Sequence, residues 1–253
     1  MAPAMKMFGL TARLRRVAHE LRDARRFRRE FEAFAAASAA RPARFSVSWD
    51  DRFPCLADRT ATTGFDRHYV YHTAWAARVL AATRPGRHVD IGSSLYFAAL
   101  ASAFVPMEFY DVRPAELELD GLRCGAADLQ RLPFADRSIE SLSCMHVLEH
   151  VGLGRYGDSL DPDGDSRAAE ELGRVLAANG QLLLVVPVGR PRVRFNAHRI
   201  YSLGQVSGMF PCLQLKEFAL VPDDPRDGGL LRGAEAAAER QDYGCGCFRF
   251  VRQ

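Results

Sequence analysis

The stretch HVDIGSS, residues 88–94, decides the fold of this 253-residue chain. A short apolar strand ends there at Gly92 and leads into a helical pattern of small residues. Such a turn exposes backbone N–H groups at a helix N-terminus, which suits a nucleotide or a carboxylate. The usual loop of this kind has two or three glycines, whereas Ser93 and Ser94 stand in two of those places here. We therefore predict a nucleotide-type site at this turn, with Asp90, Gly92, Ser93 and Ser94 as cofactor-binding residues.

Around this stretch, strand and helix patterns alternate along the chain, which predicts an α/β, Rossmann-like, doubly wound and mostly parallel sheet. Residues 181–187 form a continuous apolar run, typical of a strand buried on both faces. Residues 213–220 and 244–251 indicate two later strands that close the sheet as an antiparallel pair. The other expected strands are 88–91, 107–111 and 139–145, and the expected helices are 66–82, 94–104, 166–178 and 202–210.

A basic arm, residues 1–42, precedes the α/β domain, residues 43–253. Residues 5–38 carry apolar side chains at three- and four-residue spacing with arginines between them, which predicts one long helix. Residues 1–44 contain eleven Lys or Arg and four Asp or Glu, whereas the rest of the chain contains 23 and 27. The positive net charge of the whole chain, +3, therefore comes from the arm, whereas the rest of the chain has more acidic than basic residues. The apolar positions are Leu10, Leu14, Val17, Leu21, Ala24 and Phe31.

Three partners stay open for this arm. The helix packs on the domain or on a second copy of the chain, or it lies on an anionic membrane surface. It lacks the aromatic-interleaved basic patch that binds single-stranded nucleic acid, so we expect no nucleic acid. No stretch approaches the roughly 20 apolar residues of a membrane span. We expect a cytoplasmic protein with reduced thiols, peripheral to the inner membrane if the arm binds lipid.

Acidic residues follow the next strands. Asp111 ends the expected strand 107–111, about 20 residues beyond Asp90, where dinucleotide folds hold a ribose hydroxyl. The segment ADLQRLPFADRSIESLSCMHVLEH, residues 127–150, then resembles a stretch of class I S-adenosylmethionine-dependent methyltransferases. The segment EELGRVLAANG, residues 170–180, is similar to a helix and turn of the same family. The resemblance implies a seven-stranded sheet with an antiparallel last strand, and S-adenosyl-L-methionine as the cofactor.

By this resemblance, Asp128 contacts the adenine amino group, Leu129 flanks the ring, and His146 and Glu149 lie at the mouth of the site. Residues 45–251 also resemble a narrower group, the bacterial domain-of-unknown-function 268 family. The shared stretches are FDRHYVYHTAWAAR, VDIGSSLYF, SLSCMHVLEHVGLGRYGD, DPDGD, FNAHRIY and YGCGCF. This resemblance implies a methyltransferase-like fold and no established substrate, and its members are often thought of alongside surface-polysaccharide genes. Our leading hypothesis is methyl transfer to a small or sugar-derived acceptor.

Candidate substrate contacts follow two of the expected strands. Asn196, His198, Arg199 and Tyr201 come after strand 181–187, at the edge of a parallel sheet where ligands bind. Arg199 suits a carboxylate or phosphate, because its guanidinium donates two parallel hydrogen bonds. The loop RYGDSLDPDGD, residues 155–165, is either a solvated acidic turn or a lid over a substrate or a cation. The other expected substrate contacts are Glu149, Arg155, Tyr156 and Asp158.

Three histidines are candidate catalytic bases, namely His146, His150 and His198. A base helps methyl transfer only where the acceptor must lose a proton. An alternative hypothesis is a catalytically altered relative that binds another ligand, such as a nucleotide-sugar, because Ser93 and Ser94 carry β-carbons where glycines permit close approach. A third is a membrane-associated interaction protein that works through the basic arm.

Three patterns in the chain suggest metal ligands, and each has a simpler explanation. HVLEH, residues 146–150, spells the H-x-x-E-H pattern of zinc proteases, but that pattern needs one long helix and glycines follow it at once. His68 and His72 are four residues apart, and their aromatic neighbours favour a packed helix face. Cys245 and Cys247 share one face of a strand and favour two core thiols. We therefore predict no metal site.

Overall fold

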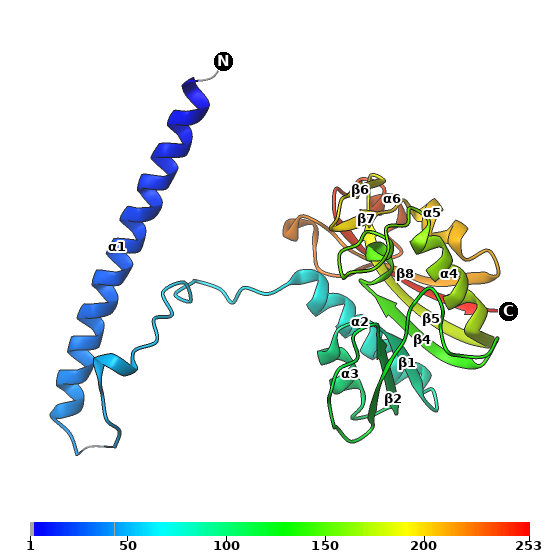
Figure 1. The fold of residues 1–253 in the computed structure, drawn as a ribbon, viewed down its shortest axis with the longest axis horizontal. Coiled ribbons are helices and arrows are strands. Elements are labelled where there is room, and N and C mark those ends of the chain that lie inside the picture. The colour runs from blue at the N-terminus through cyan, green and yellow to red at the C-terminus, as the bar shows by residue number, and fades with distance from the viewer. Residues whose placement is uncertain (1–2, 43) are drawn as a thin grey trace. The chain divides into compact units, whose positions relative to one another are not determined.

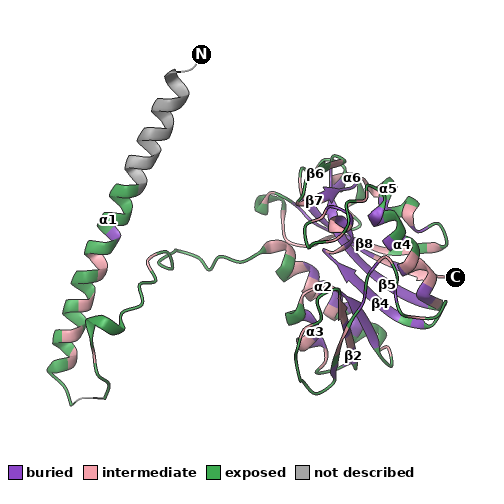
Figure 2. Cartoon of the chain, in the orientation of Figure 1, coloured by how far each residue is buried: buried purple, intermediate pink, exposed green. Residues whose placement is uncertain are grey.

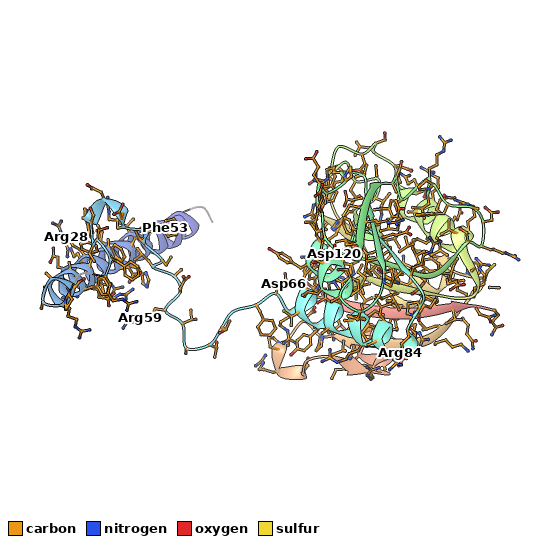
Figure 3. The ribbon with its side chains drawn as sticks, turned by 90° about the horizontal axis from the view of Figure 1, so that it is seen from below. Arg28, Phe53, Arg59, Asp66, Arg84 and Asp120 are labelled. Atoms are coloured by element: carbon orange, nitrogen blue, oxygen red, sulfur yellow. The ribbon has the colours of Figure 1, made fainter. Side chains whose placement is uncertain are left out.

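The computed structural model describes residues 3–42 and 44–253, with side chains described from Val17 onward. The chain forms two compact units, Met1–Gly64 and Phe65–Gln253 (Figure 1). The predicted arm ends at residue 42, whereas the first unit extends to Gly64, because the segment after the helix folds back onto it. Figure 3 labels Arg28, Phe53 and Arg59 in the first unit and Asp66, Arg84 and Asp120 in the second.

The first unit is one long helix, α1 (Pro3–Ala39), with a segment packed against its C-terminal half. That segment contains the short 3-10 helix η1 (Trp49–Asp51). The Trp49 ring lies 4.9 Å from the ring of Phe31 and 5.9 Å from that of Phe27. These contacts cover part of the apolar side of the helix, and much of the rest of it is exposed (Figure 2). Exposed apolar side chains on α1 include Val17, Leu21 and Phe34.

The prediction of a long N-terminal helix over residues 5–38 is confirmed. Two of its predicted apolar positions, Leu10 and Leu14, lie outside the residues whose side chains are described. Within residues 3–42 and 44–253, no helix is both long and apolar enough to cross a membrane.

The second unit is built on an eight-stranded sheet of order β3-β2-β1-β4-β5-β10-β8-β9. Its strands are β1 (His88–Ile91), β2 (Met107–Asp111), β3 (Leu122–Ala126), β4 (Ile139–Met145), β5 (Leu176–Val188), β8 (Leu213–Val221), β9 (Leu231–Arg232) and β10 (Gly244–Arg252). The first five are parallel to one another, and β10 runs antiparallel to both β5 and β8. The predicted Rossmann-like sheet with an antiparallel closing strand is confirmed, and the short β9 adds an eighth strand at its edge.

Helices cover both faces of this sheet, as a doubly wound fold requires. Along β5, Leu182 and Leu184 face one buried cluster with α4 and α5, whereas Leu183 and Val185 face another with α2 and α3. The strands are the most buried part of the unit (Figure 2). The helices are α2 (Arg67–Thr83), α3 (Leu95–Ala101), α4 (Gly164–Val175), α5 (Leu203–Met209) and α6 (Glu235–Ala238), and the 3-10 helices are η2 (Leu148–His150) and η3 (Pro225–Asp227).

Three local predictions differ from the structure. The helix expected over residues 166–178 ends at Val175, because residues 176–178 already belong to β5. The segment after β5 forms a small antiparallel hairpin of β6 (Arg192–Arg194) and β7 (His198–Ile200). Strand β3 was not expected, because its sequence LRCGA has no clear apolar alternation and contains a glycine.

Candidate functional site

The carboxyl ends of four neighbouring strands meet at one cavity, which we call the first cavity. Gly92 follows β1, Asp111 ends β2, Asp128 follows β3 and His146 follows β4, and all four line this cavity. β1 and β4 are neighbours in the sheet, although the chain passes through β2 and β3 between them. Such a reversal of strand order is where open α/β sheets bind ligands.

The turn after β1 is held by a serine side chain. Gly92 has a φ of +66°, and a β-carbon there would lie 3.2 Å from Val147 Cγ1. Ser93 Oγ accepts a hydrogen bond from the N–H of Met145 at 3.0 Å, which ties the turn to the end of β4. Ser94 is the N-cap residue of α3. The described residues that line the first cavity include Gly92 but neither serine.

Asp90 is buried beneath this turn. Its Oδ1 accepts from the Ser93 N–H at 3.0 Å, and its Oδ2 accepts from the Ser143 hydroxyl. Burial raises the pKa of Asp90 to about 6, although its hydrogen bonds to Ser143 and Ser93 act in the opposite direction. Ser143 Oγ also lies 2.8 Å from His88 Nε2, and burial lowers the pKa of His88 to about 3. This chain of side chains joins β1 to β4 and positions the turn.

Asp111 and Asp128 present carboxylates to the first cavity, with Leu129 as an apolar neighbour. The backbone N–H groups of Arg113 and Gln130 donate to one oxygen of each carboxylate, at 2.7 and 2.9 Å. These local bonds fix both side chains at their strand ends. Carboxylates in these positions accept hydrogen bonds from hydroxyl and amino donors, which an adenosyl group offers.

The first cavity is narrow. It holds about 140 Å³, compared with roughly 300–1,000 Å³ for a typical small-ligand site. The Arg113 guanidinium lies 4.5 Å from the ring centroid of Tyr156, and both residues line the cavity. Asp158, which also lines it, accepts from the N–H groups of Gly152 at 2.7 Å and Tyr156 at 3.2 Å. These contacts hold the loop after η2 over the strand ends.

A second cavity of about 450 Å³ adjoins the first. His146, His150 and Tyr156 line both cavities, so a ligand in one borders a ligand in the other. The volume suits a small molecule of sugar size. The other residues that line the second cavity are Phe65, Asp66, Arg67, His68, Tyr69, Glu149, Arg155, His198 and Tyr243.

His146 is oriented by a buried carboxylate. Its Nδ1 lies 2.8 Å from Glu149 Oε1. Burial acts to raise the pKa of Glu149, but the charge and hydrogen bond of His146, followed by the charge of His150, lower it below its ordinary value. Because the carboxylate only accepts, Nδ1 of His146 carries the proton and Nε2 carries the lone pair. Among the described residues, this buried Nε2 has no hydrogen-bond partner.

His150 and His198 complete the row of imidazoles along the second cavity. His150 Nδ1 lies 2.6 Å from the carbonyl oxygen of Ala197 and donates to it, which leaves the Nε2 lone pair. Burial lowers the pKa of His150, although Glu149 acts to raise it. Burial also lowers the pKa of His198, whose ring packs 4.7 Å from that of Tyr243. Both imidazoles are therefore neutral near pH 7 and able to accept a proton.

Three residues expected at the substrate lie outside both cavities. Arg199 donates to the Pro162 carbonyl at 3.1 Å and pairs with Asp165 at 3.5 Å. Tyr201 donates its hydroxyl to Asp165 at 2.9 Å. These bonds hold the acidic loop against α4, and both side chains line a separate cavity beside α4 and α5. Asn196 is exposed in the turn of the β6–β7 hairpin.

Two residues of the site, His68 and Tyr243, were not predicted from the sequence. The His68 ring stacks on that of His146 at 5.3 Å and on that of Tyr243 at 5.1 Å. Burial, followed by the charge of His146, lowers the pKa of His68 to about 4. The four-residue spacing of His68 and His72 suggested that the two histidines share a metal ion. In the structure, Nδ1 of His72 lies 2.7 Å from the backbone carbonyl oxygen of His68. The spacing of residues along the chain could not predict the contact between His68 and Tyr243, which is near the C-terminus.

The H-x-x-E-H pattern does not form a protease helix. Only Leu148–His150 is helical, as the single 3-10 turn η2, so residues 146–150 lack the continuous helix that would aim both histidines at one ion.

A comparison with protein families matches residues 134–217 to the model described as Caenorhabditis protein of unknown function, DUF268. The match supports the predicted resemblance over a narrower range than residues 45–251. No curated protein matches the chain significantly.

Solved structures of the same fold agree over most of the chain. The YcgJ protein from Bacillus subtilis is 17% identical with a TM-score of 0.51, over 73% of this chain and 99% of that one. The N-methyltransferase NodS from Bradyrhizobium japonicum WM9, in complex with S-adenosyl-L-homocysteine, is 14% identical with a TM-score of 0.51, over 73% and 86%. The [4+2]-cyclase SpnF is 14% identical with a TM-score of 0.50, over 70% and 80%. At these identities the likeness establishes the fold: the chain has the fold of class I S-adenosylmethionine-dependent methyltransferases, and its residues 134–217 match DUF268.

Proposed function

We propose that this chain is an S-adenosylmethionine-dependent methyltransferase that acts on a small or sugar-derived acceptor. The observation that carries the proposal is the border of His146, His150 and Tyr156 that the two cavities share. Methyl transfer requires two ligands held in line with their reacting atoms close together. A nucleotide-type cavity at the strand ends and a second cavity beside it provide two such places.

The residues of the first cavity fit an adenosyl group. Asp111 would accept hydrogen bonds from the ribose hydroxyls, and Asp128 from the adenine amino group, with Leu129 against the ring. Gly92, which has no β-carbon, lets the ligand approach the backbone. When bound, S-adenosylmethionine supplies an electrophilic methyl group. The loop that carries Tyr156 must move outward, because the cavity is narrower than this ligand.

The second cavity fits a polar acceptor with flat faces. Tyr69, Tyr243 and the imidazoles offer ring faces for apolar contact, while their polar edges orient hydroxyl groups. His150 and His198 are the residues we assign to removal of the acceptor proton, because each keeps a neutral ring next to the cavity. A proton transfer of this kind typically contributes about 10²–10⁴ in rate.

A second candidate function is binding of a different ligand, such as a nucleotide-sugar. It is favoured by the serines that stand where this fold usually has glycines, and the name of SpnF records another reaction on the same fold. Thermal unfolding with S-adenosylhomocysteine and, separately, with UDP-glucose distinguishes the two. Ligand at 100 times Kd adds about 2.7 kcal/mol, which is about 5–10 °C in Tm for a chain of this size. We expect the rise with S-adenosylhomocysteine alone; a rise with UDP-glucose alone would support the second candidate.

A further inference from the structure

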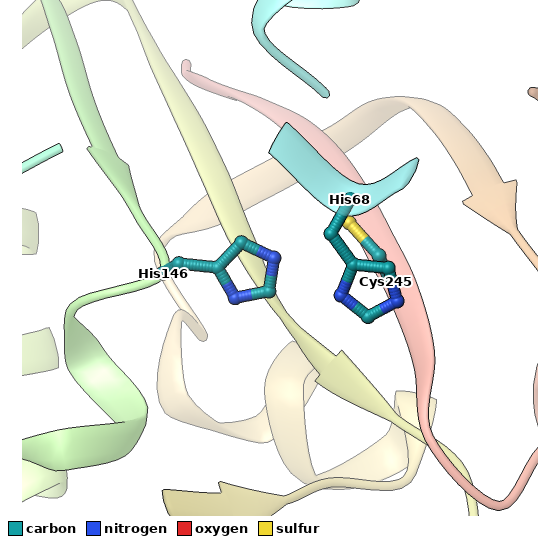
Figure 4. A group of neighbouring side chains, drawn as sticks. All are labelled: His68, His146 and Cys245. Carbon is teal, nitrogen blue, oxygen red and sulfur yellow. The ribbon is translucent and has the colours of Figure 1, made fainter. Parts of the chain in front are cut away.

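We propose that His68, His146 and Cys245 bind a divalent transition-metal ion of the zinc class beside the second cavity. The three side chains come from the first turn of α2, the end of β4 and the start of β10 (Figure 4). One donor atom from each lies within 4.8 Å of the other two. In a tetrahedral zinc site with these ligands the donor atoms are about 3.3–3.6 Å apart. Closure by roughly an ångström therefore completes the site.

His146 is prepared for this role by its surroundings. Glu149 holds the Nδ1 proton, and the lone pair of Nε2 is buried without a hydrogen-bond partner among the described residues. A carboxylate behind the distal nitrogen is the arrangement that orients metal-binding histidines and makes them more basic. His146 also adopts a φ of +58°, which is unusual for a residue with a β-carbon. The strand end is therefore shaped to aim this ring.

The donor set selects the class of ion. Two imidazoles and one thiolate suit Zn²⁺, which binds nitrogen and sulfur ligands without a redox change. Cys245 is fully buried, and on binding its S–H proton is lost to solvent as the S–Zn bond forms. The His68 ring is stacked nearly parallel to that of His146, at 9°, so it must turn to direct a nitrogen at the same ion.

Three protein ligands leave one position of a tetrahedral ion open, as in catalytic zinc sites. His68 and His146 line the second cavity, so the open position faces the acceptor. A catalytic role of the ion rests on the proposed methyltransferase function and specifies its acceptor. An open position on a zinc ion suits an oxygen ligand, so we infer that the acceptor is an alcohol or a phenol. Its hydroxyl oxygen binds the ion, and its proton passes to His150. The oxygen then forms the new O–CH₃ bond as the S–CH₃ bond breaks and its electron pair returns to sulfur.

Metal titration of the full-length protein tests the site. Protein stripped with a chelator is titrated with Co²⁺ and then with Zn²⁺. We expect one ion per chain, a thiolate-to-cobalt charge-transfer band in the near ultraviolet, and displacement of cobalt by zinc. Cys245→Ala should abolish the band and weaken zinc binding about tenfold or more. Cys124→Ala, a control at a half-buried thiol of β3, should retain both.

Two further variants keep the test decisive. Glu149→Gln should keep the band and weaken zinc binding about 10–100-fold. His68→Gln, at a partly exposed position, replaces Cys245→Ala if the latter does not fold, and should weaken zinc binding similarly. Wild-type protein that binds neither ion, or a band that survives in Cys245→Ala, would overturn the site. S-adenosylhomocysteine binding is measured separately on the stripped protein, so loss of the metal site alone leaves the proposed function standing, and the reverse also holds.

Discussion

The guanidinium of Arg113 lies 4.5 Å from the ring centroid of Tyr156. Arg113 follows β2 and Tyr156 follows η2, so this contact joins two loops that meet over the first cavity. An exposed cation–π contact stabilises by about 0.5–1 kcal/mol. The contact therefore acts as a weak cover, which a ligand displaces at small cost.

Tyr156→Ala should increase the association rate of S-adenosylhomocysteine by about two- to fivefold, the factor that corresponds to 0.5–1 kcal/mol. Stopped-flow binding measures this rate. Arg113→Ala should increase this rate by a similar or smaller factor, because Tyr156 also contacts Arg155 and His150. The double variant should not exceed Tyr156→Ala, because both changes remove the contact between Arg113 and Tyr156. Additive effects of the two single changes would show that the contact does not cover the cavity.

Ser93→Gly, which restores a glycine at the turn, should destabilise the protein. It removes the acceptor of the Met145 N–H and adds backbone freedom, at a total cost of about 1–2.5 kcal/mol. Urea unfolding measures this change. Ser94→Gly is the matched control and should cost only a few tenths of a kcal/mol, as is usual for glycine at a helix N-cap. Equal losses in both variants would contradict the assigned role of Ser93.

The free energy of unfolding should fall as the pH drops below about 6.5. The folded-state pKa of His88 is lowered to about 3, so the unfolded chain binds more protons between these values. The slope from this group approaches about 1.4 kcal/mol per pH unit. Asp90, with its pKa raised to about 6, opposes it in part, since it binds its proton in the folded state. His88→Gln should flatten the decline measured by urea unfolding from pH 7 to 5, and an unchanged slope would show that His88 does not cause it.

For the basic arm we propose contact with anionic membrane surfaces. Full-length protein should sediment with vesicles that contain phosphatidylserine and not with phosphatidylcholine vesicles. Replacing the exposed Arg22, Arg25 and Arg29 of α1 with glutamine should weaken binding about a hundredfold, because each basic residue contributes about 1 kcal/mol at such a surface. If the variant sediments as the wild type does, these arginines do not mediate the contact. If the full-length protein sediments with neither kind of vesicle, lipid contact is excluded and self-association is the remaining hypothesis.

The sequence predicted the parallel sheet because its strands are apolar runs that end in turns and alternate with helices. It also predicted that Gly92 and Asp111 lie at strand ends, and parallel strands bring such ends together without further information. Asp128 was placed at the site by the family resemblance alone, because the strand before it was not expected. Strand β3 was not predicted because its sequence LRCGA has low β-propensity. It lies at the edge of the sheet, where it pairs with β2. The local sequence pattern was therefore enough to predict the carboxyl edge of the sheet and part of the first cavity.

The second cavity could not be predicted in the same way. His68 and Tyr243 are in contact because α2 and β10 pack together. The spacing of residues along the chain does not predict such a long-range contact. Arg199 looked like a ligand-binding residue because its partner in the acidic loop, Asp165, becomes visible only in three dimensions. Both contacts depend on packing between residues far apart in the sequence.

Calorimetry of the full-length protein with S-adenosylhomocysteine measures whether the first cavity binds the cofactor. We expect one ligand per chain with a Kd of about 1–100 µM, within the usual range of enzyme substrates. Asp111→Asn and Asp128→Asn should each weaken binding about tenfold or more, because a hydrogen bond to a charged group is worth about 1.5–3 kcal/mol. Asp120→Asn, at an exposed turn before β3, should bind as the wild type does. No binding heat at millimolar ligand, or equal affinity in all three variants, would show that the first cavity is not a cofactor site.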